Sequence, residues 1–88
     1  MSNQQRFYID GQWVEPAVPA FRDVINPATE APAGRIAMGA AADVERAVAA
    51  ARAAFPAFAA TTREERLDLF ARIGAAYKKR YDDMARAI

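Results

Sequence analysis

The chain has 88 residues, of which 53% are hydrophobic and 26% charged, a globular composition with room for one domain at most. Twelve Lys and Arg residues are interspersed with eleven Asp and Glu residues, so we expect no nucleic-acid partner. The sequence has neither cysteine nor histidine, which excludes disulfides, thiolate metal sites and a cysteine nucleophile within these residues.

Short β-prone runs occupy the first part of the chain. Residues 6–15 are predicted to form a β-hairpin, because Asp10-Gly11 tolerates the positive φ angles of a two-residue type I′ turn. A further strand is predicted over 21–26, since the proline that follows favours an extended conformation in the residue before it and then closes the strand. Residues 34–38 are a candidate for another short strand.

The hydrophobic period changes after the strands and predicts a helix over 41–55. Asp43 stands in its first turn, where a negative charge complements the helix dipole, and Pro56 is expected to stop the helix. An apolar stripe recurs at helical spacing: Val44, Ala47, Val48, Ala51 and Phe55. We expect this face to pack tightly against a neighbour.

A second helix is predicted over 62–88. Thr62 precedes Glu65 by three residues, the arrangement of a capping box in which each side chain satisfies a backbone amide of the other residue. Its stripe consists of Phe70, Ile73, Tyr77, Tyr81, Met84 and Ile88. No Gly or Asn cap and no breaker closes this pattern, so we expect the natural helix to run on beyond the last residue.

No catalytic, cofactor-binding or metal-ligating residue can be assigned. The three isolated glycines Gly34, Gly39 and Gly74 form no phosphate-binding loop, and Gly74 is interpreted as a close packing contact within the second helix. Trp13, with the aromatic residues of the preceding strand, is interpreted as the buried face of the hairpin rather than a stacking platform.

The clustered charges also favour structural roles. The neighbouring carboxylates of Glu64-Glu65 and Asp82-Asp83 point in different directions on a helix and cannot converge on one reacting atom. The basic run Lys78-Lys79-Arg80 is interpreted as a solvated helical face, not a phosphate site. We therefore assign these groups to caps and to the solvent-facing surface.

Four blocks of sequence resemble the N-terminal segment of the aldehyde dehydrogenase superfamily. The run from Tyr8 to Val14 looks like the family's opening hairpin, and Ile25-Asn26-Pro27-Ala28-Thr29-Glu30 looks like the segment that follows. The stretch Asp43–Phe55 is similar to the family's first helix, and Thr62 with Glu65, Arg66 and Leu69 to its second. One departure is Phe58, where relatives commonly carry tryptophan.

The resemblance implies an α/β fold in which residues 1–88 are a partial N-terminal segment of one Rossmann-type, cofactor-binding domain. It also implies a parent enzyme that oxidises an aldehyde to a carboxylic acid with NAD or NADP through a cysteine thioester. The family's catalytic cysteine, general-base glutamate, oxyanion-hole asparagine and cofactor-binding residues lie downstream, so this segment alone is expected to be inactive scaffold that binds no cofactor. Some relatives bind a monovalent cation through a main-chain carbonyl that falls at Val24 or Ile25.

The partners implied are the remainder of the chain, an aldehyde substrate and, for the full-length protein, further copies in a homo-oligomer. No apolar run approaches the ~20 residues of a membrane span, and the first residues do not resemble a secretory signal, so we expect no membrane partner and a cytoplasmic location. The alternative is a small non-catalytic α+β module for interaction or oligomerisation. A membrane-surface helix over 62–88 is disfavoured because Asp68, Asp82 and Asp83 interrupt its basic face.

Overall fold

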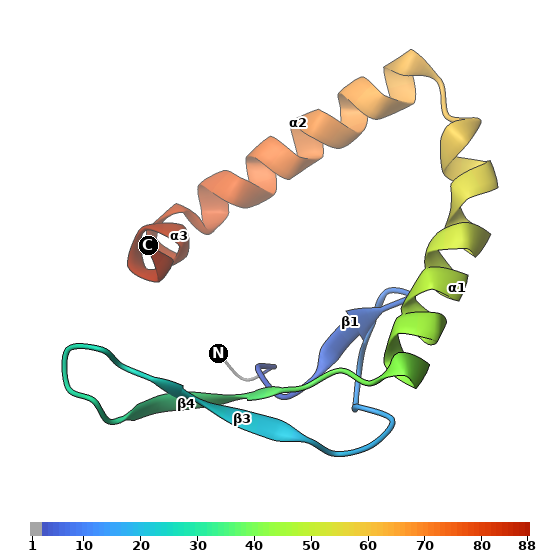
Figure 1. Ribbon diagram of the computed structural model, residues 1–88. Helices are drawn as coiled ribbons and strands as arrows, with labels where there is room; N and C mark the ends of the chain where they lie inside the picture. Colours follow the sequence, from blue (N-terminus) through green and yellow to red (C-terminus); the bar gives the residue numbers. More distant parts are fainter. Residues whose placement is uncertain (1–2) are drawn as a thin grey trace. The chain divides into compact units, whose positions relative to one another are not determined.

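The computed structural model describes residues 3–88, which form four strands and three helices in the order β1-β2-β3-β4-α1-α2-α3 (Figure 1). The chain divides into two compact units, one ending at Phe55 and one extending from Pro56 to Ile88. All four strands and most of α1 belong to the first unit. The second unit contains the end of α1 together with α2 and α3.

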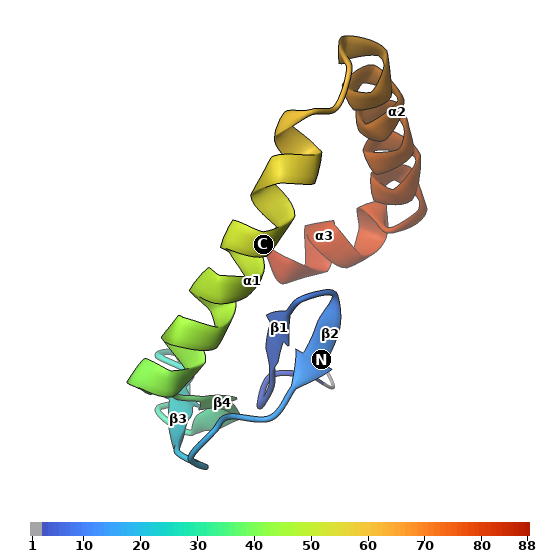
Figure 2. The ribbon, with the colours of Figure 1, turned by 90° about the vertical axis from the view of Figure 1, so that its right-hand side faces the viewer.

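Strands β1 (Phe7–Ile9) and β2 (Gln12–Val14) form an antiparallel hairpin in which Tyr8 lies opposite Trp13 (Figure 2). The two turn residues, Asp10 and Gly11, both have positive φ angles, of 53° and 73°. Positive φ at both central positions defines the type I′ turn, whose twist matches that of the flanking strands. The hairpin therefore follows from the Asp-Gly dipeptide that predicts it.

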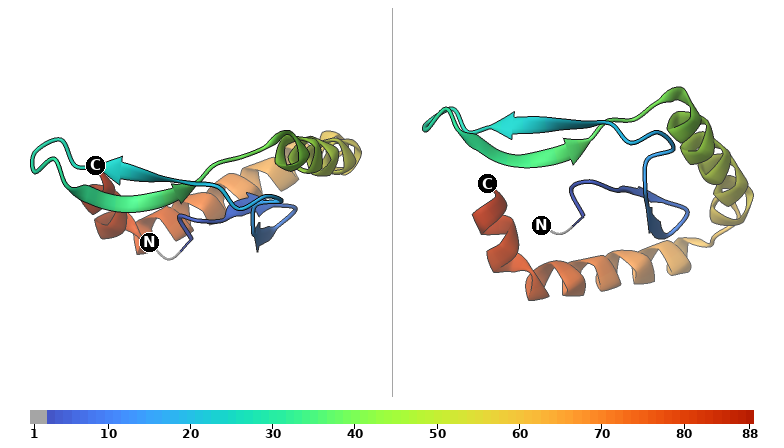
Figure 3. Two further views of the ribbon diagram at one scale, coloured as in Figure 1. Left: turned by 60° about the horizontal axis from the view of Figure 1, so that its bottom comes forward. Right: turned by 90° about the horizontal axis from the view of Figure 1, so that it is seen from below.

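Strands β3 (Phe21–Ile25) and β4 (Pro32–Ala37) form a second, longer antiparallel hairpin, which Figure 3 shows from two sides. Phe21 pairs with Ala37 at one end, and an irregularity between Val24 and Ile25 shifts the register. An ion pair between Asp23 and Arg35 (3.0 Å) links the two strands on an exposed face. With Ile25 opposite Pro32, the ladder ends in a turn.

The bounds of both strands differ from the prediction. The strand predicted over 21–26 ends at Ile25, because the Asn26 amide donates to the Ala31 carbonyl (2.9 Å) and its own carbonyl accepts from Glu30 (2.7 Å), which closes the turn. The strand predicted over 34–38 spans 32–37 instead. Pro32 has no amide to donate, but the first residue of a strand needs none.

Helix α1 (Ala41–Ala59) is one turn longer than the predicted helix over 41–55, because it continues through Pro56. Pro56 lacks the amide that would donate to the carbonyl four residues earlier, and its ring crowds that carbonyl. Alanine-rich residues on both sides have high helix propensity, and the next turn closes with the Ala60 amide on the Pro56 carbonyl (3.2 Å). The helix therefore tolerates the proline and ends four residues later than predicted.

The single helix predicted over 62–88 is two helices, α2 (Arg63–Lys79) and α3 (Tyr81–Ala87). Arg80 separates them with φ −115° and ψ 21°, and its amide closes a tighter turn on the Tyr77 carbonyl (3.0 Å). Two acidic residues follow in the first turn of α3, where carboxylates favour a helix start. One of them, Asp83, pairs with both Arg80 (3.3 Å) and Arg86 (2.9 Å) and stabilises the new start.

Very little of the described chain is buried. Within residues 3–88, only Ile9, Pro16 and Asp43 are buried, Ile9 at 9% and Asp43 at 4% exposure, while nineteen large apolar side chains are exposed. The exposed set includes Val44, Val48 and Phe55 of the α1 stripe and the whole α2–α3 stripe, namely Phe70, Ile73, Tyr77, Tyr81, Met84 and Ile88. These residues have the spacing of core positions and no core to enter within the described residues.

Across residues 3–88, no helix combines the length and the apolar character that a membrane crossing demands.

Candidate functional site

Groups able to perform covalent catalysis or hold a metal are scarce in this chain. The sequence supplies no cysteine thiol and no imidazole. Across residues 3–88, no three Asp or Glu side chains come together in a way that could hold a metal ion. A nucleophile–base pair of the Cys–His or Ser–His type cannot therefore be built from these residues.

The acidic pairs and the basic run have structural partners. Glu65 accepts the Thr62 amide at 3.0 Å while the Thr62 hydroxyl accepts the Glu65 amide at 3.1 Å, so the predicted capping box is formed. Lys78 and Lys79 lie in the last turn of α2, where positive charge complements the helix dipole. These groups begin and end a helix and do not converge on a substrate.

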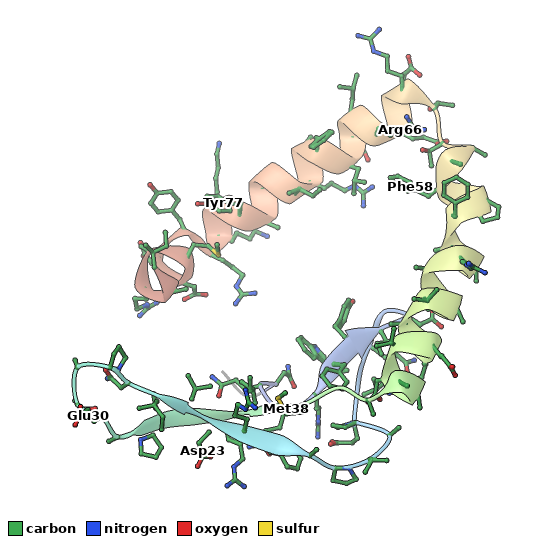
Figure 4. The ribbon with its side chains drawn as sticks, in the orientation of Figure 1. Asp23, Glu30, Met38, Phe58, Arg66 and Tyr77 are labelled. Atoms are coloured by element: carbon green, nitrogen blue, oxygen red, sulfur yellow. The ribbon has the colours of Figure 1, made fainter. Side chains whose placement is uncertain are left out.

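The turn between α1 and α2 is organised around one hydroxyl. The Thr61 hydroxyl donates to the Phe58 carbonyl (2.7 Å) and accepts from Nε of Arg66 (2.9 Å). The Arg66 guanidinium lies 5.9 Å from the centroid of the Phe58 ring, close enough for a cation–π contact (Figure 4). An aromatic ring at position 58 therefore has a definite role in the local packing of this turn.

The close packing contact expected at Gly74 stays a prediction, because residues 3–88 provide no neighbour for it. A Cβ atom added there meets no heavy atom within 4 Å, so the residue makes no close contact within the part of the chain described. Gly34 is the crowded position, because a Cβ there would lie 3.1 Å from Oε1 of Gln4. A Cβ at Gly39 would make an ordinary contact of 3.7 Å with the ring of Phe7.

The aromatic residues of the first hairpin do not form its buried face, contrary to the prediction. Tyr8 and Trp13 are 63% and 50% exposed and contact each other across the strands, with ring centroids 5.1 Å apart and ring planes tilted by 57°. Ile9 is the buried residue of β1, because alternate residues of a strand point to opposite sides. The Tyr8–Trp13 pair stabilises the hairpin from its outer side.

The Asn-Pro turn lies at the tip of the β3–β4 hairpin. The Asn26 side chain accepts the Ala28 amide at 2.9 Å, and Glu30 adopts a positive φ of 59° to complete the turn. The register shift between Val24 and Ile25 falls at the two carbonyls that the resemblance connects with a monovalent cation. Cation binding at Val24 or Ile25 stays a prediction.

Asp43 is the centre of the best-defined polar cluster. Its Oδ2 atom accepts the Ala40 amide (3.0 Å) and its Oδ1 atom accepts the Ala17 amide (2.9 Å). Nη2 of Arg46 donates to the same Oδ1 (3.3 Å) and to the Glu15 carbonyl (3.1 Å). The hydrogen bonds from Ala40 and Ala17 lower the pKa of the Asp43 carboxyl, and the Arg46 charge adds to this effect while burial opposes it.

A groove of about 420 Å³ lies between β1 and the first turns of α1, beside this cluster. It is lined mainly by apolar atoms and carries neither a nucleophile nor a proton donor poised for catalysis, since the Asp43 carboxylate is occupied by its own hydrogen bonds. The lining residues are Arg6, Phe7, Tyr8, Ile9, Gly39, Asp43, Val44 and Ala47.

The family of the chain follows from its similarity to known proteins. The model of the aldehyde dehydrogenase family matches residues 13–88, which is most of the chain. The chain belongs to the aldehyde dehydrogenase family. The α/β fold and the order of the sequence blocks agree with this assignment.

Individual aldehyde dehydrogenases share the same region. A 3-succinoylsemialdehyde-pyridine dehydrogenase from a Pseudomonas species is 42% identical over all 88 residues. Those residues amount to 18% of that protein, so the chain spans less than one fifth of the length of this curated relative.

Two solved structures have the same fold. An aldehyde dehydrogenase from Bartonella henselae superposes with a TM-score of 0.87 at 37% identity, over 94% of this chain and 17% of that one. A mutant of aldehyde dehydrogenase C from Pseudomonas syringae, in complex with NAD+ and octanal, superposes with a TM-score of 0.89 at 45% identity, over 98% of this chain and 18% of that one. The segment therefore has the conformation of the equivalent part of aldehyde dehydrogenases.

The Asp43 cluster is the feature that the sequence patterns did not identify as a cluster. Asp43 is predictable as a first-turn carboxylate, but its bond to Ala17 spans 26 positions and has no local signature. The sequence does contain a partial signal. An acidic side chain at the third position of a helix often accepts the backbone amide of the N-cap residue.

Proposed function

We propose that the chain is the N-terminal part of an NAD(P)-dependent aldehyde dehydrogenase and that its residues act as scaffold for the enzyme. The whole chain aligns with 18% of the curated relative described above, and 98% of it superposes on 18% of the aldehyde dehydrogenase C structure. The parent reaction is the oxidation of an aldehyde to a carboxylic acid through a cysteine thioester. A cysteine is absent here, so the nucleophile belongs to the rest of the protein.

The observation that carries the scaffold role is the exposed apolar stripe of α2 and α3. Tyr77 and Tyr81 pack edge to face with centroids 5.8 Å apart, yet both remain about half exposed or more, at 49% and 61%. Burying a large apolar side chain contributes about 1.5–3 kcal/mol, so six exposed members of one stripe represent a large unused stabilisation. We infer that the remainder of the aldehyde dehydrogenase chain covers this face.

We infer that residues 3–88 do not by themselves bind a dinucleotide. Its glycines are isolated, and no glycine-rich loop opens α1 or α2. NAD or NADP would supply the hydride acceptor in the parent enzyme, bound by residues outside this chain. The structure of the Pseudomonas syringae relative with NAD+ supports a nicotinamide cofactor for the family.

The same proposal extends to partners and location. We infer a homo-oligomer of the full-length protein, an aldehyde as substrate and a cytoplasmic location, each from the resemblance to aldehyde dehydrogenases.

The test is a comparison of activities between two polypeptides. The product of the natural gene should reduce NAD or NADP when given an aldehyde, and alkylation of its thiols should abolish the activity. The 88-residue chain should show neither turnover nor tight cofactor binding under the same conditions. Turnover by the 88-residue chain, or activity that survives complete thiol alkylation, would contradict the proposal.

A further inference from the structure

One of the few buried residues within the described chain is a charged one. Asp43 is 4% exposed, more buried than Ile9, and its carboxylate accepts backbone amides from two segments of the chain. One donor is Ala40, which directly precedes α1 and whose carbonyl accepts the Val44 amide (3.2 Å). The other is Ala17, in the segment that leaves the first hairpin. These hydrogen bonds replace the ones to water that the carboxylate loses on burial.

Arg46 closes the arrangement from the next turn of α1. One nitrogen, Nη2, donates both to Oδ1 of Asp43 and to the Glu15 carbonyl, so the helix reaches two positions of the segment after β2. The other charges near this segment are the exposed Glu15 carboxylate and Arg6, which pair with each other at 2.8 Å. Arg46 is thus the cation nearest to Asp43 in the cluster.

We propose that Asp43 and Arg46 form a clasp that couples two events, the capping of α1 and the docking of the first hairpin on that helix. Position 40 is alanine, which has no side-chain acceptor and is a poor N-cap residue. The carboxylate three residues on satisfies the Ala40 amide with one oxygen and the Ala17 amide with the other. Loss of the carboxylate charge therefore releases the helix start and the hairpin together.

The clasp has a defined pH dependence. Because both amides donate to the ionised form, the pKa of Asp43 is lower in the folded state than in the unfolded chain. A lowered carboxyl pKa contributes stability that is present above the unfolded value and is lost as the pH falls through the folded value. The clasp is therefore closed at neutral pH and opens only in acid.

Asp43→Ala combined with Ala40→Ser separates a clasp from a simple helix cap. Serine at position 40 supplies a conventional N-cap and should restore the first turn of α1. It cannot supply an acceptor for the Ala17 amide. A clasp predicts that the double variant regains amide protection at residues 43–44 but not at Ala17. Asp68→Asn, which removes a carboxylate charge from an exposed i,i+4 pair with Arg72, is the control.

The measurements are hydrogen exchange and an NMR pH titration of the full-length product of the natural gene. We expect Asp43→Ala to reduce the exchange protection of the Ala17 amide about tenfold, and Asp68→Asn to leave it unchanged. In the unmodified protein, the chemical shifts of the Ala17 and Ala40 amides should change with pH together with those of the Asp43 carboxyl. The midpoint of this titration should lie at a lower pH than the midpoint for the same carboxyl in concentrated urea. Recovery of Ala17 protection in the double variant, or titration of Asp43 at its urea value, would overturn the proposal.

Discussion

Replacement of Thr62 by alanine tests the best-defined helix start in the structure. The Thr62 hydroxyl accepts a hydrogen bond from the Glu65 amide at 3.1 Å, and a Glu65 carboxylate oxygen accepts one from the Thr62 amide at 3.0 Å. Alanine removes the first bond and leaves Glu65 as the only side-chain acceptor at this end. The loss of an N-cap threonine costs about 1 kcal/mol, which lowers the folded-to-unfolded ratio of the first turn of α2 about fivefold.

Backbone carbon shifts and amide exchange at residues 63–66 report this equilibrium directly. Thr62→Ser is the matched control, because serine keeps the hydroxyl and is an equally good cap. We expect Thr62→Ala to lose helicity and protection in the first turn while Thr62→Ser retains both. Equal behaviour of the alanine and serine variants would refute the capping assignment, since only one of them removes the acceptor.

Two glycine substitutions give further predictions with opposite signs. Gly11→Ala should weaken the first hairpin by about 1–2 kcal/mol, because position 11 has a φ of 73°, a value that is unfavourable for L-residues. The cross-strand contacts between Tyr8 and Trp13 in NMR spectra measure how much of the hairpin remains formed. Unchanged contacts would contradict the type I′ assignment, and Gly39→Ala, which adds an ordinary contact, is the control. Gly74→Ala should stabilise α2 by about 1 kcal/mol, because its added methyl meets open space; reduced helicity by circular dichroism would contradict this.

Elements set by adjacent residues could be predicted from the sequence. The hairpin turn depends on Asp10 and Gly11 alone, and the start of α2 depends on Thr62 and Glu65, three residues apart. In both cases the interacting groups are so close in the chain that no tertiary packing is needed to bring them together. The residue pattern alone therefore predicts the geometry of this turn and of this helix start.

The ends of the helices depend on a balance that a pattern does not resolve. Pro56 costs one hydrogen bond, and the alanine-rich residues around it offset that cost, so α1 continues to Ala59. At Arg80 the apolar stripe runs on without a break, yet the backbone turns and Asp83 begins a new helix with two arginine partners. The Asp82-Asp83 pair was the available signal, because acidic residues favour the first turn of a helix.

The candidate site was the least accessible to prediction. The bond between Asp43 and Ala17 joins residues 26 positions apart, and only the docking of the hairpin on α1 brings them together. Burial was also misjudged for Tyr8 and Trp13, since two strands with no further layer leave their outer face exposed. Non-local contacts of this kind require the folded backbone and cannot be inferred from the residue pattern.

The central claim is that these 88 residues are scaffold for a longer aldehyde dehydrogenase. The intact mass of the polypeptide made from the natural gene tests it most directly. We expect a mass several times the 9.6 kDa of the present chain, because the chain spans 18% of the curated relative. A natural product of 9.6 kDa would contradict the claim and would favour a small interaction module with exposed apolar faces.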